Sequence, residues 1–297
     1  MQNFQGTGVA LVTPFINGKV DFDALARIID HVAQPEGVDF VVSLGTTGEP
    51  VTMSAAEQMQ VLEFTIQHVA GRVGVVAGFG GNNTQKLCDD IAAFHFEGVD
   101  AILSASPAYN RPTQEGIYQH YMALAEIAPR PIILYNVPGR TASNMTAETT
   151  LRLAAHGTKA FAGIKEASAN LAQMTTIARL KPNDFQLISG DDALTLPIIS
   201  IGGVGLISVA ANAFPLETAA MVRAARANDW KTAQNLNFML QNLIDLMFVD
   251  GNPAGVKAML AQMGICSREV RLPLTPVTEK TWAAIEAEIS LKSQVLT

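Results

Sequence analysis

The sequence predicts an α/β protein in which eight parallel strands close as a (β/α)8 TIM barrel with a C-terminal helical appendage. Eight short apolar runs recur along the chain at spacings of roughly 30 residues, about the length of one strand–helix unit. Most of these runs are continuously apolar and rich in β-branched residues, a pattern typical of strands covered on both faces. The 297 residues also exceed the roughly 250 that such a barrel needs, which leaves room for the appendage.

The elements are expected in strict alternation. The strands are predicted at residues 8–15, 39–45, 73–80, 101–107, 131–137, 161–167, 186–191 and 205–212. Amphipathic patterns typical of helices lie between them, for example at residues 23–33, 55–70, 84–96 and 115–128. Residues that favour helix starts stand at four of the expected positions: Ser54 with Glu57 three residues on, Asn83, Thr113 and Thr146.

The rest of the chain is predicted to be helical. After Asn212 helical patterns cover residues 216–227, 231–248, 253–263 and 279–291, and no linker-like stretch interrupts them. We therefore expect a barrel at residues 1–228 and a helical segment, residues 229–297, packed on it. A doubly wound open sheet is the alternative fold, but it usually has fewer strands. It also favours a glycine-rich phosphate loop after the first strand, where this chain has Thr13-Pro14-Phe15.

Composition excludes several classes of protein. Hydrophobic residues make up 48% of the chain, which supports a large core, and the net charge of −7 disfavours a nucleic-acid partner. Cys88 and Cys266 fit neither a disulfide framework nor a zinc site. No apolar run reaches the roughly 18 residues of a membrane helix, and the start Met1-Gln2-Asn3-Phe4 lacks the features of a signal peptide. We expect a cytoplasmic protein that contacts neither nucleic acid nor membrane.

Lys165 is the first candidate for chemistry, because it stands near the end of the sixth strand among apolar residues. Active sites of such barrels lie at these strand ends. Burial disfavours the charged ammonium, and a neutral amine can attack a carbonyl to form a Schiff base. The alternative is a lysine with a buried stem and a salt bridge, for example to Glu166.

Four further residues fall at the same predicted face. Tyr135 ends the fifth strand, and its hydroxyl could transfer protons. Arg140 follows on a Pro-Gly loop and carries a planar fork that suits a carboxylate. Thr46 and Thr47 lie in a Gly-Thr-Thr-Gly turn after the second strand, whose hydroxyls and backbone N–H groups could hold a small carboxylate. Each of these also has an ordinary structural interpretation as a rim, loop or turn residue.

Other polar residues offer no metal or cofactor signature. Asp191 and Asp192 follow the seventh strand without a histidine at ligand spacing, and we interpret them as loop and helix-cap residues. The histidines fall in or beside predicted helices, where packing or surface roles are expected: His31, His68, His95, His120 and His156. The set at the barrel face is what imine chemistry on a small keto acid requires, and it needs no cofactor.

Five motifs resemble those of the dihydrodipicolinate synthase family, in order and spacing. They are Gly45-Thr46-Thr47-Gly48-Glu49, Tyr109-Asn110-Arg111-Pro112, Tyr135-Asn136-Val137-Pro138-Gly139-Arg140-Thr141, Gly163-Ile164-Lys165-Glu166-Ala167 and Ser189-Gly190-Asp191-Asp192. The resemblance runs from about Gly6 to Pro276. The family consists of pyruvate-dependent class I aldolases in the N-acetylneuraminate lyase superfamily.

The resemblance implies a lyase that condenses pyruvate with L-aspartate 4-semialdehyde to give 4-hydroxy-tetrahydrodipicolinate, in lysine and diaminopimelate biosynthesis. It also implies a homotetramer of two tight dimers. Lys165 would form the Schiff base, and Tyr135 would donate protons through a relay by way of Thr46 to Tyr109 of a neighbouring subunit. Thr47 and the backbone at Gly190 and Ile207 would surround pyruvate. Arg140 would bind the carboxylate of aspartate semialdehyde.

Two alternatives and two departures accompany this interpretation. An N-acetylneuraminate lyase or sugar-acid aldolase would share the lysine and tyrosine but would not need Arg140, and a silent barrel could bind an amino-acid metabolite. Ala108 replaces a second tyrosine of many members, which weakens an aromatic stack at the dimer interface. At the cleft where sensitive members bind lysine, only Asn82 matches, so we expect weak or absent inhibition by lysine. The differing positions are Pro50, Val51, Ala55, Gln58, Lys86 and Ala108.

Overall fold

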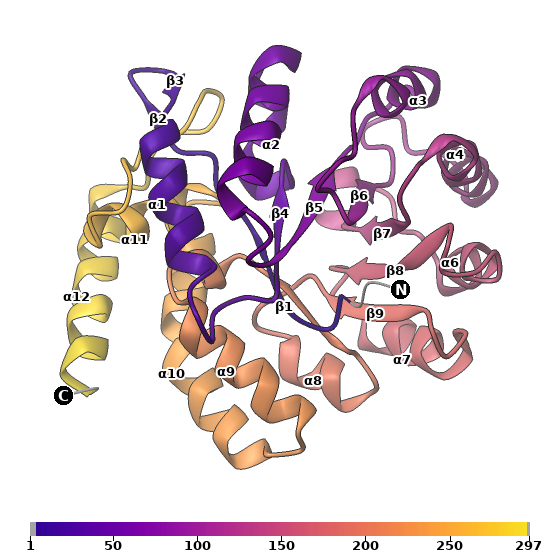
Figure 1. Ribbon diagram of the computed structural model, residues 1–297. Coiled ribbons are helices and arrows are strands. Elements are labelled where there is room, and N and C mark those ends of the chain that lie inside the picture. Colours follow the sequence, from indigo (N-terminus) through magenta and orange to yellow (C-terminus); the bar gives the residue numbers. More distant parts are fainter. Residues whose placement is uncertain (1–3, 296–297) are drawn as a thin grey trace.

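The computed structural model describes residues 4–295, and within that range eight parallel strands form a closed barrel ringed by helices (Figure 1). Neighbouring strands follow the order β1-β10-β9-β8-β7-β6-β5-β4, and β4 pairs with β1 to close the ring. This confirms the predicted barrel and contradicts the open-sheet alternative. Met1, Gln2 and Asn3, on which the signal-peptide prediction rests, lie outside the described residues.

Each barrel strand lies on one of the predicted apolar runs. The strands are β1 (Gly6–Ala10), β4 (Phe40–Ser43), β5 (Gly74–Gly78), β6 (Ala101–Ala105), β7 (Ile132–Asn136), β8 (Phe161–Glu166), β9 (Gln186–Ser189) and β10 (Gly205–Ser208). Every barrel strand ends before its predicted run does, and β1 begins two residues ahead of its run. The apolar residues past the strand ends are buried turns at the mouth of the barrel, which is why periodicity alone did not separate them from the strands.

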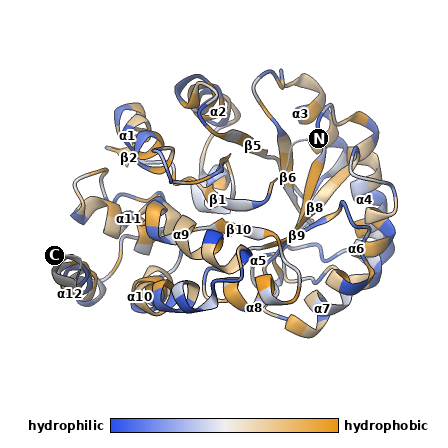
Figure 2. Cartoon of the chain, turned by 60° about the horizontal axis from the view of Figure 1, so that its bottom comes forward, coloured by the Kyte–Doolittle hydropathy of each residue, from blue (hydrophilic) through white to orange (hydrophobic). Residues whose placement is uncertain are grey.

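Two apolar layers surround the strands. Inside the ring, side chains such as Val42, Leu103, Ile133 and Ile188 pack with Phe4, whose ring meets Phe40 edge-on at 5.7 Å. Outside the ring, a larger layer joins the strands to the helices. In Figure 2 strands β6 and β8 lie mostly in the hydrophobic colours, whereas the surrounding helices carry both colours. The strands are therefore buried on both faces, as their continuous apolar runs predicted.

The helices begin at the capping residues that the sequence predicted. Ser54 and Glu57 form a reciprocal capping box, and Asn83, Thr113 and Thr146 each accept a backbone N–H of the first turn. The first eight helices are α1 (Phe22–Val32), α2 (Ala55–Val69), α3 (Thr84–Ala93), α4 (Gln114–Ile127), α5 (Pro138–Thr141), α6 (Ala147–Ala154), α7 (Leu171–Leu180) and α8 (Thr195–Ser200). A small hairpin of β2 (Phe15–Ile16) and β3 (Lys19–Val20), which the sequence pattern missed, precedes α1.

The C-terminal part is helical and packs along one side of the barrel (Figure 1). It comprises α9 (Pro215–Arg226), α10 (Trp230–Phe248), α11 (Ala254–Gln262) and α12 (Glu279–Val295). Helices α9 and α10 pack on each other across the predicted boundary at residue 228, so the two predicted parts share a continuous core. No helix within residues 4–295 is long and apolar enough to cross a membrane.

Candidate active site

Lys165 and Tyr135 lie side by side at the mouth of the barrel. They are register partners on the adjacent strands β8 and β7, so both side chains point to the same face of the sheet. The Lys165 Nζ lies 4.4 Å from the centre of the Tyr135 ring. Lys165 is only 5% exposed, and Tyr135 belongs to the apolar cluster inside the ring. The geometry therefore places an amine and a phenol together where both side chains are largely buried.

Lys165 does not pair with Glu166, which excludes the salt-bridge alternative for that residue. Successive residues of a strand point to opposite faces, and Glu166 accepts hydrogen bonds from Asn136 Nδ2, the Ser168 backbone N–H and Gln173 Nε2. Burial raises the pKa of the Glu166 carboxyl, and these hydrogen bonds oppose the rise. Among the described residues, no carboxylate or hydrogen-bond acceptor contacts the Lys165 amine.

Gly190 leaves the space that the Lys165 side chain occupies. A Cβ built on Gly190 would lie 3.0 Å from Lys165 Cγ, 3.1 Å from Lys165 Cε and 2.8 Å from the Ala167 Cβ. The Gly190 N–H meanwhile donates to the carbonyl of Glu166, so the backbone of β9 stays attached to β8 beside the lysine. A glycine is therefore required here by close approach rather than by an unusual backbone angle.

Ile207 and Asp192 close the far side of the mouth. Ile207 on β10 is buried in the same interior cluster as Tyr135. Asp192 is fully buried and accepts a short hydrogen bond from the Ser208 hydroxyl and another from the Val209 N–H at 2.9 Å. The helix-cap interpretation of Asp192 was wrong: α8 begins after Leu194 without a side-chain cap. The carboxylate instead ties the end of β9 to the end of β10, a pairing that only the closed barrel creates.

The predicted Gly-Thr-Thr-Gly turn is a single turn of 3₁₀ helix, η1 (Thr46–Gly48), that follows β4. Thr47 is buried, and its Oγ1 accepts a hydrogen bond from Asn252 Nδ2 at 3.0 Å. The hydroxyls of Thr46 and Tyr135 make no hydrogen bond within residues 4–295, so the structure does not itself connect the predicted relay between them. Glu49 ends the turn in the left-handed region, at φ 56°.

A buried ion pair anchors that turn to the C-terminal segment. Glu49 Oε1 meets Lys257 Nζ of α11 at 2.5 Å, and neither side chain is more than 1% exposed. Lys257 also donates to the Glu269 carbonyl at 2.9 Å and lies 4.2 Å from the centre of the Phe15 ring. Burial lowers the pKa of Lys257, while the charge of Glu49 acts in the opposite direction. Sequence reasoning assigned no role to this pair, because its members are about 200 positions apart.

Arg140 lies in α5 with its guanidinium in solvent. The only hydrogen bond of this side chain among the described residues runs from Nη2 to the carbonyl of Asn252 at 3.3 Å. Asn252 thus contacts both Thr47 and Arg140, the two predicted carboxylate binders. It was missed in the sequence, where the Asn-Pro pair between two helices reads as an ordinary turn.

Tyr109 is not brought to this site by its own chain. It lies in the loop after β6, is 90% exposed and has a φ of 67°, which is unusual for an aromatic residue. Its exposure is compatible with a role towards another subunit. The relay through Thr46 to Tyr109 remains a prediction.

Lys86, Asn82 and Ala108 of the predicted lysine cleft make contacts within the chain. Lys86 Nζ contacts the Asp90 carboxylate one turn further along α3 at 2.5 Å, and Asn82 Oδ1 accepts the Ala108 N–H at 2.9 Å. The Asp90 contact offsets part of the charge that we expect to repel a ligand ammonium.

Neither the buried histidine nor any cluster of possible metal ligands among the described residues adds a candidate for chemistry. His120 is buried beside Thr84, and burial lowers its pKa to about 4. Within residues 4–295, no group of three His, Cys, Asp or Glu side chains could hold a metal ion.

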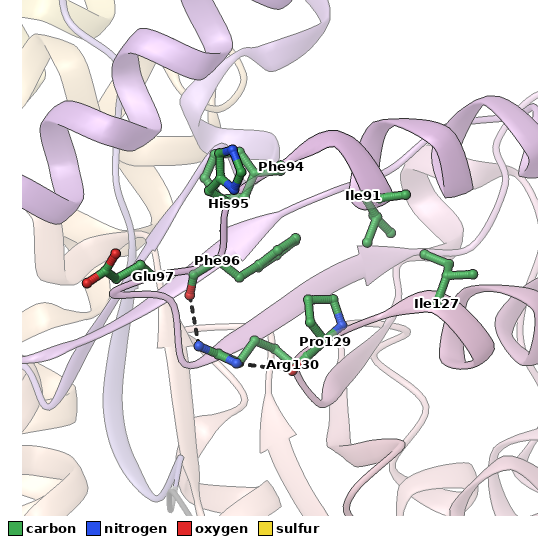
Figure 3. Close-up of a pocket in the computed structure, with 9 residues that line it drawn as sticks. Ile91, Phe94, His95, Phe96, Glu97, Ile127, Pro129 and Arg130 are labelled. Atoms are coloured by element: carbon green, nitrogen blue, oxygen red, sulfur yellow. Dashed lines mark hydrogen bonds between the residues drawn. The ribbon is translucent and has the colours of Figure 1, made fainter.

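A shallow cleft of about 530 Å³ lies at the opposite end of the barrel, before β6 and β7 (Figure 3). There Arg130 donates to the carbonyls of Phe96 and Val99, so the guanidinium fastens two loops together.

Comparison with known proteins agrees with the geometry. The sequence profile of the Dihydrodipicolinate synthetase family matches residues 3–292. The 4-hydroxy-tetrahydrodipicolinate synthase of Parabacteroides distasonis is 48% identical over 284 residues, 95% of either chain. Dihydrodipicolinate synthase from Aquifex aeolicus superimposes with a TM-score of 0.93 at 36% identity, covering 98% of both chains. A monomeric dihydrodipicolinate synthase variant gives a TM-score of 0.94 at 35% identity, covering 98% of this chain and 97% of the other.

Proposed function

The chain belongs to the dihydrodipicolinate synthetase family, and from that premise we propose that it condenses pyruvate with L-aspartate 4-semialdehyde through an imine on Lys165. The observation that carries the proposal is a buried lysine amine at the barrel mouth, 4.4 Å from a tyrosine ring and without an acidic partner among the described residues. The family match supports this reaction over that of a sugar-acid aldolase.

The first step is attack of the neutral Lys165 amine on the C2 carbonyl of pyruvate. A carbinolamine forms and loses water to give the protonated imine, and the Tyr135 hydroxyl beside the amine is placed to supply and recover protons. No ion pair among the described residues engages the Lys165 amine, so the nitrogen does not have to leave a salt bridge before it attacks the carbonyl. The imine carbon would then lie beside the Tyr135 phenol, since Lys165 Nζ lies 4.4 Å from the centre of that ring.

Condensation follows from the imine. Loss of a proton from C3 gives an enamine, whose C3 attacks the aldehyde carbon of L-aspartate 4-semialdehyde and forms the new carbon–carbon bond. The amino group of that substrate then attacks C2, closes the ring and releases Lys165 as a free amine. No step requires an oxidant, a reductant or a metal ion.

Two carboxylates must be held during this sequence. We assign the carboxylate of pyruvate to Thr47, with the backbone at Gly190 and Ile207 lining the site. We assign the carboxylate of aspartate semialdehyde to Arg140. Its guanidinium makes one hydrogen bond to a backbone carbonyl, so its other N–H groups can donate to a carboxylate.

The relay and the assembly are the finer part of the proposal. Tyr109, exposed on its own chain, would reach the site of a second copy and complete a hydroxyl path through Thr46 to Tyr135. A homotetramer of two tight dimers is the arrangement that the resemblance implies, with Ala108 weakening the stack at the tight interface.

Reductive trapping tests the proposal directly. Incubation with pyruvate and borohydride should add one reduced three-carbon unit to the chain, and peptide mapping should locate it on Lys165. Lys165→Ala should abolish the adduct. An adduct on Lys159 or Lys257 would overturn the assignment of the nucleophile.

A further inference from the structure

Asn252 lies between the two proposed carboxylate binders. It belongs to the short connection between α10 and α11, far in sequence from both of its partners. Its side chain donates from Nδ2 to Thr47 Oγ1 at 3.0 Å, and its main-chain carbonyl accepts from Arg140 Nη2 at 3.3 Å. One residue therefore contacts the group assigned to pyruvate and the group assigned to the second substrate.

The direction of the first hydrogen bond matters chemically. A threonine hydroxyl has one proton to donate and lone pairs to accept with. Because Asn252 donates into the Thr47 oxygen, the hydroxyl proton of Thr47 must point elsewhere. Thr47 makes no other side-chain hydrogen bond within residues 4–295, so this proton stays free to donate to a carboxylate.

The other end of the Asn252 amide is not satisfied. Its Oδ1 is buried and has no hydrogen-bond partner among the described residues. A buried acceptor without a partner is destabilising. The bond from Nδ2 to Thr47 is thus the only side-chain hydrogen bond of Asn252 among the described residues.

We propose that Asn252 is a positioning residue that turns the Thr47 hydroxyl into a donor for the pyruvate carboxylate and fixes Arg140 relative to it. The inference rests on the proposed function and adds a determinant that the sequence motifs did not contain. It also gives the C-terminal segment a part in substrate binding.

The same segment holds the Thr47 turn at a second point. Two residues after Thr47, Glu49 forms the buried pair with Lys257 of α11, and the Arg271 N–H donates to the other Glu49 oxygen at 3.2 Å. The turn and Asn252 are thereby fastened to one rigid element. A change confined to the Asn252 side chain should leave this anchor in place.

The test compares Asn252→Asp with Asn242→Asp. Asn242 is an exposed residue of α10 that donates to Glu288, so it controls for the charge change in the same segment. An ionised aspartate in place of Asn252 cannot donate and would instead accept the Thr47 proton. We expect the KM for pyruvate to rise by roughly 10- to 100-fold, the equivalent of one hydrogen bond to a charged group. The turnover number and melting temperature should change little.

A pH profile separates positioning from general damage. A protonated aspartate can donate a hydrogen bond, so the KM defect of Asn252→Asp should shrink as the pH is lowered from about 8 towards the pKa of the introduced carboxyl, usually near 4. The KM for aspartate semialdehyde should change less, since Arg140 binds the main-chain carbonyl. An unchanged KM for pyruvate, or a defect equal at all pH values, would overturn the inference.

A double-mutant cycle gives the same answer without the charge. Asn252→Ala and Thr47→Val should not be additive in KM for pyruvate, because both act through one hydroxyl. Additive effects would contradict the inference. The cycle also tests the inference if the Asn252→Asp variant does not fold. Borohydride trapping at saturating pyruvate should still label Lys165 in each folded variant. Failure of the unmodified chain to trap pyruvate would instead contradict the proposed function.

Discussion

Two buried lysines in this chain have opposite surroundings. Lys257 is fully buried, contacts the Glu49 carboxylate and the Glu269 carbonyl, and lies over the Phe15 ring. Lys165 is nearly as buried and lies over the Tyr135 ring at a similar distance, yet no acceptor contacts its amine among the described residues. The partners of a lysine, rather than its burial, distinguish the structural cation from the candidate nucleophile.

The arginines repeat the contrast. Arg271 donates to both Glu57 oxygens and to the Gly18 carbonyl, and its guanidinium also lies over the Phe15 ring. Arg140 has one backbone carbonyl. Cations satisfied inside the chain hold the fold together, whereas those left unsatisfied are free to bind a ligand. The predictions below test that rule.

The largest difference is expected between the two lysines. Lys257→Met leaves the Glu49 carboxylate buried and unpaired, which should lower the free energy of unfolding by about 3–5 kcal/mol. Lys165→Met should abolish both the pyruvate adduct and activity while changing stability by less than about 1 kcal/mol or raising it. Urea unfolding of both variants measures this. Equal destabilisation would remove the distinction, and the double change Glu49→Leu with Lys257→Met should recover most of the loss.

The ring beside Lys165 separates packing from proton transfer. Tyr135→Phe keeps the aromatic face and removes the hydroxyl, so turnover should fall on the order of 10²–10⁴-fold while the pyruvate adduct still forms. Tyr109→Phe should also lower turnover if the hydroxyl path crosses between subunits. Full activity of Tyr109→Phe would exclude the path, and Tyr118→Phe on the outer surface of α4 is the control.

Arg140 and Arg271 should separate binding from stability. Arg140→Gln should raise the KM for aspartate semialdehyde by roughly 10- to 100-fold and that for pyruvate much less, because a charge-assisted contact to one substrate is lost. Arg271→Gln should lower the melting temperature and leave both KM values near those of the parent. A similar rise in both KM values for Arg140→Gln would assign it to the loop rather than to the substrate.

A smaller effect should follow acid titration of Glu57. Hydrogen bonds from Arg271 lower the pKa of Glu57 to about 2 from 4.5, so the stability contributed by this pair is present above pH 4.5 and is lost as the pH falls towards 2. Because the side chain is partly exposed, we expect about 1 kcal/mol or less. The variant Glu57→Gln keeps the capping box and serves as the comparison. The difference in urea midpoint between the parent and this variant should be smaller at pH 3 than at pH 6. A constant difference at both pH values would contradict the linkage.

The smallest expected effect is that of free lysine. Lys86 is paired with Asp90 and offers a ligand ammonium no carboxylate, and Pro50 lacks a backbone N–H. When activity is titrated with lysine, half-inhibition should therefore not occur below about 1 mM. A dissociation constant of about 1 mM corresponds to a binding free energy of only about 4 kcal/mol. Tight inhibition would mean that the cleft binds lysine through other residues. If the parent is insensitive as expected, Lys86→Glu should make it more sensitive to lysine, because the substitution restores a carboxylate to the cleft.

The fold was predictable because each strand is buried on both faces, and continuous apolar runs such as that around Ile132 to Asn136 carry this in the sequence. The strand-end candidates followed, since parallel strands bring their ends to one mouth. What could not be predicted were contacts between distant residues, such as Asn252 with Thr47 and Lys257 with Glu49. Such contacts leave no periodic pattern in the sequence. They form only when the C-terminal helices pack against the turn that follows β4.

Local pattern also misled in two places. The hairpin at Phe15 to Val20 has strands of two residues, too short to show alternation, although Asn17-Gly18 is a turn pair. Asp192 lies before a short helix as a cap would, but its carboxylate instead joins β9 to β10. In both cases the tertiary partner, absent from the local sequence, decided the outcome.

The missing side chain at Gly190 limits how this enzyme can vary. Every substitution there adds at least a Cβ, and that atom would lie against Lys165 Cγ and Cε. Any substitution at Gly190 would therefore require the side chain of Lys165 or of Ala167 to shift. A reactive lysine placed in another barrel should likewise have a glycine beside it at the end of the adjoining strand, because the lysine side chain needs the space that a Cβ would fill.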